Sequence, residues 1–394
     1  MGADRELGYG RQWIAPEDVE AVAHVLRGAH LTQGPAVTGF EAALCAATGA
    51  PHAVAVNNGT SALQAACLAL GIGAGARVLT TANTFLASAV APVQCGAEVG
   101  FVDVEPASGN MDLDALEAEL GRSGARVDAV VAVHFAGLPL DMRRLLALKR
   151  AFGFRLIEDA AHALGATYAE GGRTWRAGEH PGVDLSTLSF HPVKHVTTAE
   201  GGAVLAHEAE LAARVRRLAS HGIDRTAGHM PCFSSDEPGQ DPPRWFAPMV
   251  EPGFNLRLSD VHAALGTSQL ARLPAFLARR RALAARYRAA LPEVLPSATP
   301  CDPGDAARGH AWHLFWVRVP RRDGLMRHLA ARGIGTQVHY YPVPHQPWFA
   351  ARYGAPRVPR AVEHARTALS LPLYPALTDA DQERVLEALA EWRP

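Results

Sequence analysis

The sequence has 394 residues, a formal net charge of −1, 48% hydrophobic residues and 20% charged residues. This length suits two packed units rather than one small core, and the balanced charge argues against a nucleic-acid-binding surface. We expect no membrane contact, because no apolar run reaches the roughly 18 residues of a membrane span and no apolar signal region follows the N-terminus.

Short strands and helices alternate along the first part of the chain. The pattern from Pro16 to Arg27 predicts an amphipathic helix that begins at a proline and stops at Gly28. Further helices are predicted at 37–47, 62–70, 84–93, 113–120 and 142–152, and strands at 52–56, 78–81, 99–104, 127–134 and 155–157. Strands that are apolar on both faces and separated by helices indicate an α/β fold with a mainly parallel sheet.

Polar residues lie just past the ends of several predicted strands. They are Asn58, Asn83, Asp159 and Ser189. In parallel sheets ligands collect at the carboxyl ends of the strands, so we expect the site there. The turn 57–61 also opens a helix, which would make it an anion site, although Asn58 could simply cap that helix.

The second part of the chain has a different pattern. A strand at 201–205 and a helix at 208–219 precede a loop rich in Pro and Gly at 226–243, which fits no motif. A long helical pattern at 259–291 is interrupted near Pro274. A smaller α+β unit follows, with strands at 314–319 and 335–340, helices at 324–331 and 361–368, and a closing helix that opens at Thr378 with Asp381 in an approximate capping box.

Lys194 stands between His191 and His195, after a short apolar strand, in a chain with few lysines. An amine can form a Schiff base, whereas arginine cannot lose its proton to do so. The alternative is a surface lysine on a polar turn. Asp159 is either a helix cap or a carboxylate held beneath a pyridine ring, and Phe85 is either a core residue or a ring stacked on one face of that pyridine.

An ordered series of motifs runs almost from end to end of the chain. They are LTQGP (31–35), NNGTSAL (57–63), ANTFLAS (82–88), FVDV (101–104), EDAAHALGA (158–166), SFHPVKHVTTAEGGA (189–203), SHGI (220–223), GFNLRLSD (253–260), GTQVHY (335–340) and ALSLPLYP (368–375). In these motifs the chain resembles the DegT/DnrJ/EryC1/StrS family of sugar aminotransferases. The resemblance implies the aspartate aminotransferase (type I) fold of enzymes dependent on pyridoxal 5′-phosphate (PLP). It also implies a large domain at 1–255 and a long helix with a small domain at 256–394.

The resemblance further implies a role for each matching residue. Lys194 would be the catalytic lysine that bonds to the cofactor and moves the proton. The residues that would hold PLP are Thr60 and Ser61 by their backbone, Ser189 by its hydroxyl, Asp159 at the pyridine nitrogen, Phe85 on the ring and His162 at the ring's polar edge. Asn255 would reach the phosphate of the neighbouring subunit, which implies a homodimer with shared sites. Position 194 is not the histidine of sugar dehydratases in the family, which favours transamination.

Within the family, the motif sequences most resemble those of the transaminases of pseudaminic acid biosynthesis. That likeness implies L-glutamate as amino donor and C4 of a UDP-linked 4-keto-6-deoxy-2-acetamido sugar as acceptor. Other UDP- or dTDP-linked keto-sugars remain open. Residues that could contact the sugar nucleotide are Tyr9, Arg11, His191, Arg225, Arg257 and His339, each with an alternative structural role.

Two other functions compete with transamination. A PLP-dependent lyase of the cysteine desulfurase type would need a reactive cysteine, and Cys232 in the long loop is the candidate. A regulator could have kept the fold without the chemistry, although Lys194 and Asp159 argue against it. The five cysteines are scattered without a Cys-x-x-Cys pair, so we expect reduced thiols and a cytoplasmic protein. The 18 histidines show no zinc-type spacing, so we expect no metal.

Overall fold

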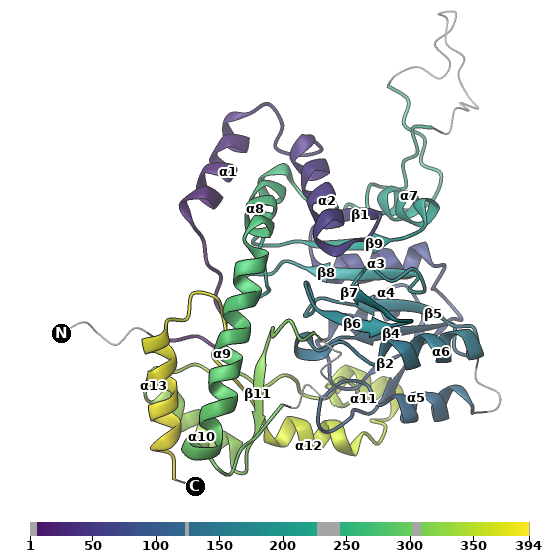
Figure 1. Ribbon diagram of the computed structural model, residues 1–394. Coiled ribbons are helices and arrows are strands. Elements are labelled where there is room, and N and C mark those ends of the chain that lie inside the picture. Colours follow the sequence, from purple (N-terminus) through teal and green to yellow (C-terminus); the bar gives the residue numbers. More distant parts are fainter. Residues whose placement is uncertain (1–5, 123–125, 227–244, 302–308, 394) are drawn as a thin grey trace, which may run out of the picture.

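A seven-stranded sheet forms the main body of the protein, and Figure 1 shows its arrangement. The computed structural model describes residues 6–122, 126–226, 245–301 and 309–393. The strands lie side by side in the order β1 (His52–Val56), β9 (Gly202–Ala206), β8 (Leu185–Ser189), β5 (Arg155–Asp159), β4 (Ala129–Val133), β2 (Arg77–Thr81) and β3 (Glu98–Val102). Neighbours from β8 to β3 are parallel, whereas β9 is antiparallel to both β8 and β1. The expected α/β fold with a large, mainly parallel sheet is confirmed.

Helices alternate with the strands of this sheet along the chain, and a short β-hairpin follows β5. The helices are α1 (Pro16–Arg27), α2 (Pro35–Thr48), α3 (Gly59–Ala69), α4 (Ala87–Gln94), α5 (Leu113–Leu120), α6 (Met142–Phe152), α7 (Ala209–Leu218) and α8 (Asp260–Ala271). The hairpin consists of β6 (Thr167–Glu170) and β7 (Arg173–Arg176), which pair antiparallel.

Both faces of the sheet are buried, and each strand contributes side chains to the two faces in alternation. On β4, Val131 belongs to the apolar cluster with α3 and α7, whereas Val130 and Ala132 belong to the cluster with α5 and α6. All five residues of β4 are buried. Burial on both faces explains why the strand reads in the sequence as an unbroken apolar run.

Helix ends follow the local signals that predicted them. The bounds predicted for α1, α5 and α6 agree with the structure. Helix α6 begins where Asp141 accepts a hydrogen bond from the Arg144 amide at 3.1 Å and ends at Gly153, which has a φ of 73°. That left-handed conformation has no steric cost for glycine, so the stop is encoded locally.

Two predictions of local structure need correction. Helix α4 begins at Ala87, three residues later than expected, and leaves Phe85 in the preceding loop. Segment 335–340 does not form the expected strand. Within it only Gln337 pairs as in a sheet, with Ser370, while the Gly335 amide bonds to the Leu7 carbonyl and the Tyr340 amide bonds to Asn83. The β6–β7 hairpin is not predicted by the sequence pattern.

A second, smaller sheet follows the long helix α9 (Leu273–Val294). It contains β10 (Thr299–Pro300), β11 (Phe315–Arg318) and β12 (Ala368–Leu371) in that order, all antiparallel. The helices around it are α10 (Arg322–Ala330), α11 (Pro347–Tyr353), α12 (Pro359–Thr367) and α13 (Asp379–Ala390). The capping box of Thr378 and Asp381 is present at the start of α13. Pro274 lies at the start of α9, so the long helical pattern divides there into α8 and α9.

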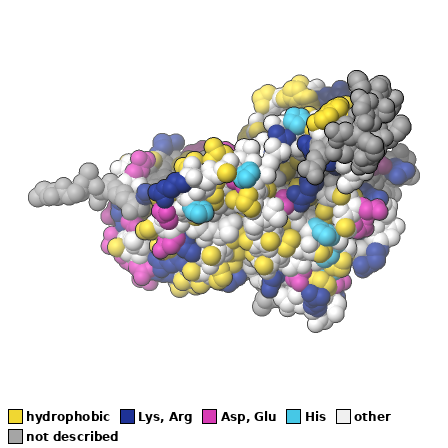
Figure 2. Space-filling model, turned by 90° about the horizontal axis from the view of Figure 1, so that it is seen from above, with side chains coloured by type: hydrophobic (Ala, Val, Ile, Leu, Met, Phe, Trp, Pro, Cys, Tyr) yellow, Lys and Arg dark blue, Asp and Glu magenta, His cyan; other side chains and the backbone are white. Residues whose placement is uncertain are grey.

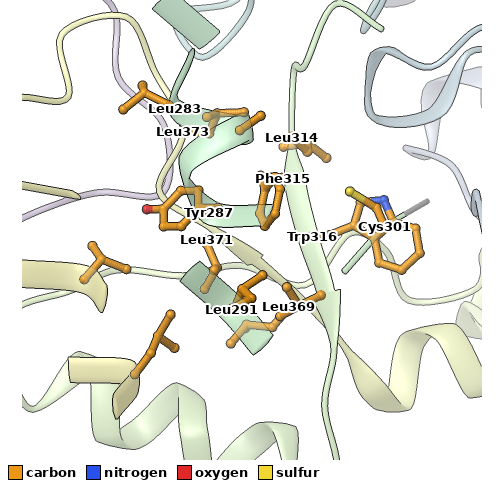
Figure 3. Close-up of a cluster of buried hydrophobic side chains, with 14 of the residues drawn as sticks. Leu283, Tyr287, Leu291, Cys301, Leu314, Phe315, Trp316, Leu369, Leu371 and Leu373 are labelled. Atoms are coloured by element: carbon orange, nitrogen blue, oxygen red, sulfur yellow. The ribbon is translucent and has the colours of Figure 1, made fainter. Parts of the chain in front are cut away.

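The core of this part is built by α9 against β11 and β12 (Figure 3). Tyr287 and Phe315 have ring centroids 5.0 Å apart, and Trp316 is 1% exposed. The same buried cluster also contains Leu7, Phe135 and Ala136 from the first part of the chain. The division into 1–255 and 256–394 stays a prediction.

The surface carries acidic and basic side chains in mixture, as Figure 2 shows for one face. Among the described residues, no helix is both long and apolar enough to cross a membrane.

Candidate active site

Four strands that run in the same direction end at one edge of the sheet. Strands β2, β5 and β8 point the same way, and β1 joins them because β1 and β8 are both antiparallel to β9. Asn58, Asn83, Asp159 and Ser189 therefore lie along this edge, as the sequence predicts. The edge brings together residues that are up to 131 positions apart in the chain.

Lys194 lies in the turn between β8 and β9, at the same edge of the sheet. It lines a narrow crevice together with Arg11, Gln12, His195 and Gln269. Burial lowers the pKa of the Lys194 amine to about 8, and the nearby Asp159 opposes this shift. The amine is therefore much closer to its nucleophilic, neutral form at physiological pH than an exposed lysine would be.

This pKa leads to a test that does not depend on catalysis. In protein freed of cofactor, the reaction of Lys194 with an amine-acylating reagent should rise with pH through about 8, because only the neutral amine reacts. In the unfolded chain the midpoint should move to about 10.4. Mass spectrometry of the peptide that contains Lys194 measures the acylated fraction. Equal midpoints in folded and unfolded protein would contradict the assignment.

Asp159 is 5% exposed and is held by two donors at the end of β5. Its Oδ2 accepts a hydrogen bond from Ser88 at 2.7 Å, and its Oδ1 accepts one from the Ala161 amide at 3.1 Å. Burial raises the pKa of this carboxyl overall, although the two hydrogen bonds and Lys194 oppose the rise. Ser88 in turn lies 2.8 Å from the Thr84 hydroxyl, which orients it. Sequence reasoning missed Ser88, although it lies in the motif ANTFLAS, because only the fold brings it to Asp159.

His162 is buried against aromatic side chains from the second half of the chain. Its Nε2 lies 3.2 Å from the Tyr340 hydroxyl, and its ring centroid lies 4.2 Å from that of His313. Burial lowers its pKa well below the ordinary value, and Lys194 adds to this effect, so the imidazole is neutral. Its buried Nδ1 has no hydrogen-bond partner among the described residues. An unpartnered buried nitrogen at this place is available to a ligand.

The start of α3 forms the part of the site that suits an anion. Asn58 caps the helix by accepting a hydrogen bond from the Ser61 amide at 2.8 Å, so the capping interpretation is correct and that amide is engaged. The first-turn amides of Gly59 and Thr60 have no partner within the helix. A Cβ added at Gly59 would lie 3.2 Å from the Ser189 hydroxyl, so this hydroxyl and the free amides lie together. The free amides, the helix dipole and the Ser189 hydroxyl together suit the binding of a phosphate group.

The remaining predicted contacts fall into two groups. Tyr9 and His339 lie near the site, with ring centroids 5.2 Å apart. Burial lowers the pKa of His339 to about 3, and its Nδ1 lies 2.8 Å from the Ser370 hydroxyl. His339 is therefore neutral and cannot act as a cation toward a diphosphate. Phe85 is 56% exposed, with its ring centroid 6.1 Å from that of Tyr340.

Four other candidates are placed at the periphery or have structural partners. Arg257 donates a hydrogen bond to Ser220 at 3.1 Å. His191 is exposed, and its backbone carbonyl accepts a hydrogen bond from the Lys194 backbone amide. Arg225 is also exposed. Asn255 is exposed and forms a bridge with Ser220. Cys232 and loop residues 227–243 lie outside the described residues.

Glu158, the neighbour of Asp159, points the other way into a fully buried network. Its Oε1 lies 2.7 Å from His134 Nε2, and its Oε2 accepts hydrogen bonds from Ser186 at 2.5 Å and the Gly178 amide at 2.9 Å. Burial alone would raise the pKa of Glu158, but His134 and the other donors lower it overall. This network is satisfied on all sides and serves the fold.

Glu158→Ala should therefore lower the free energy of unfolding by about 3–5 kcal/mol, because three buried donors lose their acceptor. Urea denaturation of the variant measures the change. Glu20→Ala is the matched control, since Glu20 pairs with Arg27 on the surface and should cost less than about 1 kcal/mol. Equal losses in the two variants would contradict the structural role.

Comparison with known proteins finds one matching family and many similar structures. Residues 12–390 match the model of the DegT/DnrJ/EryC1/StrS aminotransferase family. Among solved structures, the chain is similar to PseC of Helicobacter pylori, an aminotransferase involved in the biosynthesis of pseudoaminic acid (27% identity, TM-score 0.85, 98% of each chain covered). It is also similar to DesV of S. venezuelae (36% identity, TM-score 0.82, 95% of this chain and 94% of that one). A third is Spr1654 of Streptococcus pneumoniae in its PLP form (26% identity, TM-score 0.84, 98% of each chain).

Proposed function

This chain belongs to the DegT/DnrJ/EryC1/StrS aminotransferase family, and from that premise we propose a specific reaction. The protein transfers the amino group of L-glutamate to C4 of a nucleotide-linked 4-keto-6-deoxy sugar. The sugar is UDP-linked and acetylated at its 2-amino group, as in pseudaminic acid biosynthesis. Support for this choice comes from the motifs SFHPVKHVTTAEGGA and GTQVHY and from the similarity to PseC. At 27% identity, other UDP- or dTDP-linked keto-sugars are the competing acceptors.

The cofactor is PLP, and the residues present fit it. The first-turn amides of α3 and the Ser189 hydroxyl suit the phosphate. Asp159 offers a carboxylate to the ring nitrogen, and the unpartnered Nδ1 of His162 offers a polar contact to the ring edge. When bound, the cofactor supplies an electron sink for the carbon that carries the amino group.

The protein itself transfers the proton, holds the cofactor and places a charged group beside the ring nitrogen. Lys194 acts as general base toward the α-carbon of L-glutamate and returns the proton to C4 of the sugar. Its pKa of about 8 lies near the operating pH, where proton transfer in both directions is most effective. Asp159 stabilises positive charge on the ring nitrogen, and Ser88 and the Ala161 amide hold the carboxylate in place. The single observation that carries the proposal is this amine beside a buried, oriented carboxylate.

The sugar nucleotide would enter beside the N-terminal segment. Arg11 lines the same crevice as Lys194 and is exposed, so it can pair with a phosphate. The exposed side chains of Phe85, Phe254 and Asn255 support the second part of the proposal, a homodimer in which subunits complete each other's sites. We place the enzyme in the cytoplasm, where thiols such as Cys67 stay reduced.

The test uses purified protein loaded with PLP. L-glutamate alone should shift the visible absorbance of the cofactor, and a panel of UDP- and dTDP-linked keto-sugars should then show the UDP-linked 4-keto sugar as the best acceptor. Product structure by NMR locates the new amine. A shift with L-glutamate followed by no transfer to any sugar would contradict sugar transamination. Absence of any shift would favour a regulator without turnover.

A further inference from the structure

A groove with an excess of positive charge crosses the smaller unit, away from the catalytic edge. It is bordered by β10, the turn between β11 and α10, helix α12 and the C-terminal segment, and its volume is about 950 Å³. Its arginines are Arg318, Arg321, Arg322, Arg327, Arg366 and Arg393, against the two carboxylates of Asp323 and Glu363. No residue lines both this groove and the crevice of Lys194. Figure 1 places α10, α12 and the C-terminus at the opposite end from β8 and β9.

Most of this positive charge has no counter-charge among the residues that the structure describes. The two carboxylates are already paired, Asp323 with Arg322 at 2.6 Å and Glu363 with Arg366 at 2.6 Å. Among the described residues, no ion pair involves the other four arginines. The whole chain has a net charge of −1, so the excess is local to this groove. A cleft lined by one sign of charge concentrates the opposite ion.

The groove also contains hydrogen-bond donors that are not charged side chains. Helix α10 begins in it at Arg322, after Arg321, which gives no side-chain cap, so the amides of Arg322 and Asp323 lack a partner within the helix. Amides at a helix start and planar guanidinium groups both suit phosphate oxygens.

We propose that this groove is a second binding site, which takes a small anion of the diphosphate class. Several arginines on three sides match an ion with two or more negative charges better than a single carboxylate. A nucleic acid is disfavoured, because basic side chains on the face in Figure 2 are mixed with acidic ones and form no extended basic surface there. The site goes beyond the proposed reaction, and it does not depend on which sugar the enzyme uses.

Calorimetric titration of PLP-loaded protein with inorganic pyrophosphate at low salt tests the proposal. We expect saturable binding at one site per chain that weakens as salt rises. The double variant Arg321→Ala/Arg327→Ala should weaken binding by about tenfold or more, since each arginine removed takes away charge-assisted hydrogen bonds to the anion. The matched control Arg143→Ala/Arg150→Ala removes two exposed arginines elsewhere and should leave binding unchanged. Thermal melting confirms that both variants fold.

Two further measurements distinguish binding in the groove from binding in the catalytic crevice. Arg11→Ala should leave pyrophosphate binding intact, and the groove variant should keep the absorbance change with L-glutamate. Failure of the proposed reaction would remove that absorbance change in all variants without affecting the titration. A nucleoside diphosphate that binds as tightly as pyrophosphate, or more tightly, supports the diphosphate class. Lack of saturable binding, or binding abolished by Arg11→Ala and retained in the groove variant, would overturn the proposal.

Discussion

Replacing Lys194 with arginine should reduce turnover by about 10³-fold or more while the protein stays folded. General acid–base transfer alone contributes roughly 10²–10⁴-fold, and a guanidinium cannot release its proton to take part. Arginine keeps the positive charge beside Asp159, so loss of charge would not explain the result. The rate of the half-reaction with L-glutamate, followed by the absorbance of the cofactor, measures the effect.

The chain contains its own control for this change, because Lys149 is its only other lysine. Lys149 pairs with Asp184 at 2.6 Å and donates to the Gly182 carbonyl at 2.8 Å. Both are charge and hydrogen-bond roles that arginine can fill, so Lys149→Arg should keep nearly full activity. A Lys194→Arg variant as active as Lys149→Arg would remove the basis of the proposed mechanism.

The Lys194 and Asp159 assignments come from chemistry that is local in the sequence. Asp159 follows an apolar strand, and Lys194 lies in a short turn after another. Because parallel strands end at one edge, the pattern alone predicts that the two come together. Helix ends were predictable for the same reason, as with Asp141 and Gly153 around α6.

The parts that the sequence could not predict depend on contacts between distant segments. Ser88 reaches Asp159 across 71 positions, and Tyr340 reaches His162 across 178. Segment 335–340 resembles a strand because its residues favour strands, but only Gln337 pairs with β12, at Ser370. Gly335 bonds instead to the N-terminal segment, and Tyr340 bonds to Asn83. Tertiary partners decide such cases, and a local pattern does not contain them.

The sequence does not predict that His339 is neutral, for a similar reason. In sequence it is one of 18 histidines and could be a cation. Its burial lowers its pKa to about 3, and only the fold determines that burial. The same burial beside Lys194 explains why the structure holds several neutral imidazoles around one amine.

Asp159→Asn should reduce turnover by about 10²-fold or more without destabilising the protein. The amide keeps the size of the side chain but loses the negative charge that stabilises the ring nitrogen, and fixed charges of this kind typically contribute roughly 10²–10³-fold. Stability should be unchanged or higher, because burial raises the pKa of Asp159 and so the ionised form opposes folding. Steady-state kinetics and urea denaturation of the same preparation measure both effects.

The neighbouring acid provides the comparison that makes this result specific. Glu158 and Asp159 are adjacent on β5, yet the strand directs them to opposite faces, one into a satisfied network and the other to the site. Asp159→Asn should therefore lose activity and keep stability, whereas Glu158→Ala should lose stability. A residue whose charged form costs folding energy is retained for function rather than for the fold. If Asp159→Asn instead unfolded at a lower urea concentration and kept its turnover, Asp159 would be a structural residue and the site would lack its carboxylate.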